Sequence, residues 1–95
     1  MTFIIGTCVL ELFISDSHSL KDRRQVINSL LDRLHDRFNV AAAQLDQHNS
    51  WTQATLSVAC VGNETRHVNT VLNKVLEYVE REPRVVVGGV NMEML

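Results

Sequence analysis

Hydrophobic and polar positions alternate along the first segment of the chain. One phase of the alternation carries Gly6, Cys8, Leu10, Leu12 and Ile14, and the other carries Thr7, Val9, Glu11 and Phe13. Because successive side chains of a strand point to opposite faces, this period of two predicts a strand. Its apolar character predicts a central strand with one mixed face.

A helical period follows the first strand. Ser19 with Asp22 three residues later matches a capping box, which opens a helix. From there to about Asn39 the apolar positions recur at about 100° per residue. They are Leu20, Ile27, Leu30, Leu31, Leu34 and Phe38.

Two short segments on either side of a polar turn predict a β-hairpin. Val40 to Asp46 is short and rich in Ala, and His48 to Ser50 is polar. The strand that follows has one apolar face, formed by Ala54, Leu56, Val58 and Cys60.

The clearest amphipathic helix lies in the second half of the chain. Its apolar residues are spaced by three and four positions: Val68, Val71, Leu72, Val75, Leu76 and Val79. Asn63 is the expected N-cap, and Pro83 ends the helix because its ring disfavours a helical conformation of the preceding residue. Val85 to Leu95 then predicts a last strand, with a bulge at Gly88 and Gly89.

The order β-α-β-β-α-β predicts an α+β, ferredoxin-like fold. We expect a single domain over residues 1–95, in which two helices cover one face of a four-stranded antiparallel sheet. A mixed α+β domain with different strand pairing is the alternative that the pattern leaves open.

Composition narrows the functional classes. The formal net charge is −2, so a nucleic-acid partner would have to meet a local basic patch. No Lys or Arg precedes the apolar start and Glu11 interrupts it, which favours a strand over a signal sequence. No segment approaches the roughly 20 apolar residues of a membrane span. Cys8 and Cys60 lie in strand-like segments, which favours buried, reduced thiols in a cytoplasmic protein over a disulfide.

The basic residues predict a binding site at one end of the sheet. In a ferredoxin-like arrangement the loop after Ile14, the hairpin after Asp46 and the end of the second helix all lie at that end. Eight side chains would gather there: His18, Lys21, Arg23, Arg24, His48, Trp51, Arg81 and Arg84. From them we predict an RNA- or anion-binding site formed by Lys21, Arg23, Arg24, Trp51, His18 and Arg84.

Arg23 and Trp51 each allow two interpretations. Arg23 falls within the apolar stripe of the first helix. In one interpretation its stem packs over the core edge while its guanidinium reaches water or pairs with Asp16. In the other, its guanidinium binds a phosphate together with Lys21 and Arg24. Trp51 either covers the end of the core or stacks on a base.

Metal binding and catalysis have weaker support. Asp16 with His18 and Asp46 with His48 share a D-x-H spacing, but four ligands would have to converge across an intervening strand. We therefore predict no metal and no cofactor. Buried cysteines without a flanking His, and the absence of a Gly-rich phosphate loop, predict that the protein is not an enzyme.

Four motifs together resemble the bacterial YlxP-like family, domain of unknown function 503. They are G-T-C-V-L-E-L from Gly6, S-L-K-D-R-R from Ser19, R-F-N-V from Arg37 and W-x-x-A-T-L from Trp51. The chain departs from the family pattern at Gln44, where Glu is usual, and in the small residues Ala41 to Ala43. The resemblance implies a small cytoplasmic ferredoxin-like protein without an established activity, often encoded beside translation-initiation and ribosome-maturation factors.

Two functions follow as hypotheses. The first is a non-enzymatic, cytoplasmic accessory protein that binds ribosomal RNA or the ribosome through the basic start of the first helix. The second is a protein-interaction or small-ligand regulatory module that forms a homodimer through its sheet edge or open face. Neither hypothesis involves a membrane.

Overall fold

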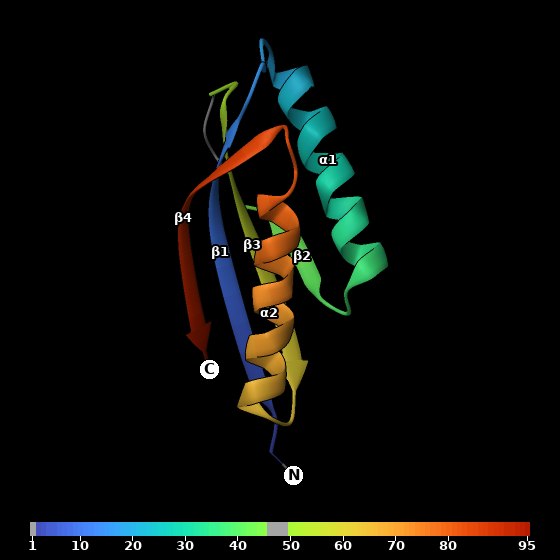
Figure 1. Cartoon of the computed structure of the whole chain (residues 1–95), viewed down its shortest axis with the longest axis vertical. Coiled ribbons are helices and arrows are strands. Elements are labelled where there is room, and N and C mark those ends of the chain that lie inside the picture. Colours follow the sequence, from blue (N-terminus) through green and yellow to red (C-terminus); the bar gives the residue numbers. More distant parts are fainter. Residues whose placement is uncertain (1, 46–49) are drawn as a thin grey trace.

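Six elements follow one another in the order strand, helix, strand, strand, helix, strand (Figure 1). They are β1 (Ile4–Ile14), α1 (Leu20–Arg37), β2 (Ala41–Gln44), β3 (Gln53–Gly62), α2 (Thr65–Glu80) and β4 (Val85–Met94). This computed structural model describes residues 2–45 and 50–95. The predicted ferredoxin-like α+β class is confirmed.

The strands form one antiparallel sheet in the order β2-β3-β1-β4. β1 is central, as its pattern predicts. Both helices lie on one face of the sheet, with α2 over β1, β3 and β4, and α1 over β2 and β3 (Figure 1). The pairing is the ferredoxin-like one and not the alternative with different strand neighbours.

The core lies between the sheet and the helices. The inward phase of β1 meets that of β3, with Cys8 opposite Val58 and Leu10 opposite Leu56. These side chains are fully buried against the apolar stripes of both helices. Gly6 is required where α2 crosses β1, because a Cβ there would lie 2.4 Å from Val68 Cγ1.

The start of α1 matches its prediction in detail. Ser19 is the N-cap, and its Oγ accepts a hydrogen bond of 3.0 Å from the Asp22 N–H. Asp22 Oδ2 in turn accepts from the His18 N–H at 3.0 Å. The two side chains therefore satisfy backbone donors on either side of the cap, as in a capping box.

Other local predictions differ from the structure. The N-cap of α2 is Glu64, not Asn63, because Glu64 is the last residue with an extended backbone before the helix. β2 is shorter than predicted, since only Ala41–Gln44 pairs with β3. Asp46 lies outside the described residues. The predicted bulge is confirmed: Val87 pairs with Leu12 and Gly89 with Glu11.

Candidate functional site

Three separated segments meet where β1 ends, as the topology predicts. The Ile14 N–H donates to the Thr52 carbonyl and the Ser15 N–H donates to the Arg84 carbonyl, both at 2.8 Å. The β1–α1 loop, the start of β3 and the α2–β4 connection are thereby joined by backbone hydrogen bonds. His48, predicted to lie here, is outside the described residues.

Arg23 is part of the fold at this end. It is 6% exposed, and its Nη1 donates to the Ser50 carbonyl at 2.9 Å and to the Gln53 carbonyl at 3.2 Å. The interpretation that placed the Arg23 stem at the core edge is correct, because the side chain is buried there. Its partners differ from the predicted water or Asp16, since the guanidinium donates to two main-chain carbonyls. Because the two carbonyls flank Trp51, Arg23 anchors the segment that carries the indole to α1.

Arg84 is held in an ion-pair network around Glu82. Its Nη2 donates to Glu82 Oε1 at 2.9 Å, its Nε to Oε2 at 3.2 Å, and its backbone N–H to Oε2 at 3.0 Å. Arg33 of α1 donates to the same carboxylate from its Nη2. Glu82 thus joins α1 to the segment after α2, and the Arg84 guanidinium is already paired with a carboxylate.

Burial and the neighbouring guanidinium groups have opposite effects on the pKa of the Glu82 carboxyl, and the guanidinium groups have the larger effect. Hydrogen bonds from the Arg84 side chain, with further help from its backbone N–H and from Arg33, lower the pKa of Glu82 to about 2 although burial alone would raise it. The pKa values of Arg33 and Arg84 rise through the same contacts. All three groups are therefore charged at neutral pH.

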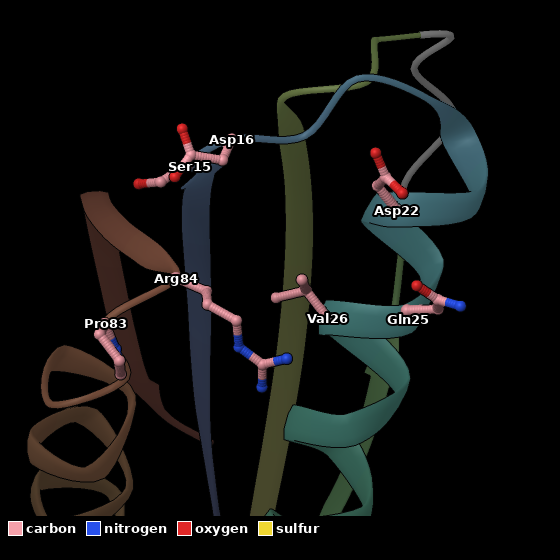
Figure 2. Close-up of a pocket in the computed structure, with 7 residues that line it drawn as sticks. All are labelled: Ser15, Asp16, Asp22, Gln25, Val26, Pro83 and Arg84. Carbon is pink, nitrogen blue, oxygen red and sulfur yellow. The ribbon is translucent and has the colours of Figure 1, made fainter.

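A hollow of about 380 Å³ lies beside Arg84, between the β1–α1 loop, α1 and the α2–β4 connection (Figure 2). It is lined by Ser15, Asp16, Asp22, Gln25, Val26, Pro83 and Arg84. Figure 2 shows the Arg84 guanidinium extending toward Val26, whereas Gln25 points away to the outer side of α1. Two carboxylates and a guanidinium that is already paired make this hollow a poor phosphate site.

The remaining predicted residues are exposed. Lys21 and Arg24, three positions apart, lie on one side of α1, and His18 precedes the helix. Trp51 is 53% exposed, so it does not cover the end of the core. These four residues, which we call the helix-start patch, are the predicted site residues whose side chains remain available to a partner.

The cysteine prediction is confirmed for burial. Cys8 is 0% and Cys60 4% exposed, and both thiols are free. Burial raises the pKa of both thiols, which disfavours the reactive thiolate.

Within residues 2–45 and 50–95, His, Cys, Asp and Glu side chains form no group of three that could hold a metal ion. Asp46 and His48, on which the D-x-H idea depended, are outside those ranges.

Sequence reasoning missed the Glu82 network, although a signal for it exists. Glu82 lies two residues beyond α2 but continues the spacing of its buried residues Val75 and Val79, as Arg23 shares the spacing of the buried residues of α1. A charged residue in a buried phase needs a partner of opposite charge or a set of hydrogen bonds.

No helix of the described chain is long and apolar enough to cross a membrane.

Comparison with known proteins agrees with this fold. A relative from Bacillus subtilis (strain 168), "Uncharacterized protein YlxP", is 27% identical over 82 residues, which cover 86% of this chain and 89% of the relative. A solved structure, the "De novo designed protein Foldit4", superimposes with a TM-score of 0.58 at 8% identity, covering 99% of this chain and 97% of the other. The family profile "Protein of unknown function (DUF503)" matches residues 5–92. The chain therefore belongs to the DUF503 family.

Proposed function

We propose that this protein is a non-enzymatic, cytoplasmic accessory protein that binds ribosomal RNA or the ribosome through the helix-start patch, His18, Lys21, Arg24 and Trp51. The observation that carries the proposal is the double hydrogen bond from Arg23 to the carbonyls of Ser50 and Gln53. It ties the segment that carries the exposed Trp51 to the first turns of α1, where Lys21 and Arg24 lie.

The chemistry of the patch suits single-stranded RNA. An exposed indole offers a face on which a base can stack, which contributes ~1–3 kcal/mol per base. Lys21 and Arg24 supply charge for phosphate oxygens, and the Arg fork can bind two of them at once. With a net charge of −2, attraction to RNA must come from such a local cluster. The genomic neighbourhood that the family resemblance implies favours the same class of function.

The test compares two charge-matched double variants. Lys21→Gln with Arg24→Gln removes the patch cations, and Arg66→Gln with Arg81→Gln removes two other exposed cations, within α2 and directly after it. We expect only the first pair to weaken retention on ribosomal RNA. It should also flatten the dependence of log K on log salt by about 1.4, since each lost single-strand phosphate contact contributes ~0.7. Equal losses from both pairs, or no binding by the parent protein, would contradict the proposal.

The role of Arg23 has its own readout. Trp51 is the one Trp of the sequence, so its fluorescence anisotropy reports the segment that Arg23 anchors. Arg23→Gln should lower the anisotropy and weaken RNA retention together, whereas Trp51→Ala should weaken retention without changing the melting temperature. An unchanged anisotropy in Arg23→Gln would show that the segment does not depend on this anchor.

Self-association through the open sheet face is a second candidate. This face carries exposed Phe3, Phe13, Val61 and Val86, each between 46% and 63% exposed. Within the described strands its charged residues are Glu11 and Glu93. The molecule measures 48 × 22 × 18 Å, so a face of about 48 by 22 Å offers on the order of 1,000 Å², above the ~800 Å² per partner of a standard interface.

The occupant that this area fits is a second copy of the chain. Sedimentation at increasing protein concentration should then show a dimer that persists in high salt. Val61→Lys should dissociate it without loss of folding, because Val61 is 63% exposed in the monomer. A monomer at all concentrations would exclude this function and leave the RNA proposal untouched.

A further inference from the structure

A second hollow, of about 360 Å³, lies at the opposite end of α1, between its last residue and the first turns of α2. Three basic side chains line it: Arg37 at the end of α1, and His67 and Lys74 of α2. α1 has 18 residues, so this hollow and the helix-start patch are separated by about 27 Å at the helical rise of 1.5 Å per residue. The two sites therefore do not overlap.

The charge of this hollow is uniformly positive. No Asp or Glu lines it. The ion pairs of the described residues gather around Glu82 and involve Arg33 and Arg84, not the basic residues of the hollow. Arg37 stacks over Tyr78, with its Cζ 5.0 Å from the ring centroid, which orients the guanidinium without neutralising it. The hollow thus presents two cations, Arg37 and Lys74, and the imidazole of His67 to a ligand.

The hollow also has apolar side chains in its lining. Phe38 and Val71 contribute to it. The Phe38 ring is held by an edge contact with Tyr78, with centroids 6.0 Å apart and planes at 77°. Ligand pockets of ~300–1,000 Å³ commonly combine such apolar surface with a few charged groups that orient the ligand. An inorganic anion would use the cations and leave the apolar surface without a partner.

We propose that this hollow binds a nucleoside monophosphate. The phosphate carries a double negative charge and several acceptor oxygens, which match Arg37, Lys74 and the His67 ring. The base is planar and apolar on its faces, and it matches the surface of Phe38 and Val71. A free nucleotide and the 5′-terminal nucleotide of an RNA share this chemistry.

NMR titration of the labelled protein tests the proposal with AMP, adenosine and inorganic phosphate as probes. AMP should shift the amide signals around Arg37, His67 and Val71, and it should bind at least tenfold more tightly than either fragment. Arg37→Gln with Lys74→Gln should weaken AMP binding at least tenfold. The matched pair Arg66→Gln with Arg81→Gln, which lies outside both proposed sites, should leave AMP binding unchanged.

A variant of the apolar surface separates base recognition from charge. Val71 of α2 is only partly buried, so Val71→Thr, which keeps the shape of the side chain, should leave the protein folded; it should weaken AMP binding while binding of inorganic phosphate stays the same. Equal affinities for AMP and inorganic phosphate would overturn the proposal by showing a simple anion site. Absence of shifts at these residues, or equal losses from both double variants, would also overturn it.

The source of the nucleotide is decided by a further titration. A short RNA with a 5′-phosphate that binds this hollow more tightly than AMP identifies an RNA end as the ligand, and a weaker one identifies the free nucleotide. RNA retention through the helix-start patch is measured separately. If RNA retention through the helix-start patch fails, the nucleotide proposal still stands. If AMP does not bind the hollow, the RNA proposal still stands.

Discussion

Replacing Glu82 by Gln should destabilise the protein more than any exposed charge substitution. The carboxylate is 4% exposed and accepts three hydrogen bonds from Arg84 and one from Arg33. Glu82→Gln keeps the shape of the side chain but removes the charge. Arg33 and Arg84 then face a neutral amide in place of a carboxylate.

The size of the effect follows from the titration of this group. Folding lowers the pKa of Glu82 from 4.5 to about 2. That difference corresponds to about 3 kcal/mol of unfolding free energy, at the lower limit of the ~3–5 kcal/mol found when buried pairs lose one partner. The lower value is expected because the Arg33 and Arg84 side chains are 34% and 46% exposed and can regain water.

The stability difference between the parent protein and Glu82→Gln should depend on pH in one direction. Because the folded-state pKa is depressed, the charge of Glu82 contributes its full stabilisation above about pH 4.5 and loses it as the pH falls toward 2. Urea unfolding of the parent and of Glu82→Gln should therefore differ by about 3 kcal/mol at pH 7 and converge at low pH.

Glu80→Gln is the matched control, because Glu80 is exposed at the end of α2, two residues before Glu82. It should change stability by less than ~0.5 kcal/mol. The reasoning is refuted if Glu82→Gln is as stable as Glu80→Gln at pH 7. A deficit that stays constant from pH 7 to low pH would equally refute it, since the loss would then not arise from the charge.

Two further predictions concern the core. Gly6→Ala should lower the unfolding free energy by about 1–3 kcal/mol in thermal or urea denaturation, because the new Cβ would meet Val68 and Leu72 side-chain atoms at 2.4 and 2.9 Å. Ready folding of this variant at parental stability would contradict the close packing of α2 on β1. Cys8 and Cys60 should react with an alkylating reagent only after unfolding in urea, because both are buried and burial raises their pKa. Rapid labelling in the native protein would contradict their placement.

The local periodicity of apolar residues was sufficient to predict the order of the helices and strands and the face of each that points into the core. The period of two in β1 and the spacing of Val68, Leu72 and Val75 in α2 follow from backbone geometry alone, so they can be recognised without a structure. The start of α1 was equally accessible, since Ser19 and Asp22 act within one turn. The N-cap of α2 was not, because backbone torsion at Glu64, and not residue type at Asn63, sets the boundary.

The amino-acid sequence by itself determined the fold class and marked Arg23 as unusual, because a charge in the apolar phase of a helix is visible in the spacing. The tertiary structure decided what that charge does, since the carbonyls of Ser50 and Gln53 lie 27 and 30 residues away along the chain. It also decided that Arg33 of α1 pairs with Glu82 and that Arg37 and Lys74 share one hollow. Such partners depend on how helices pack on the sheet, and no local spacing encodes that packing.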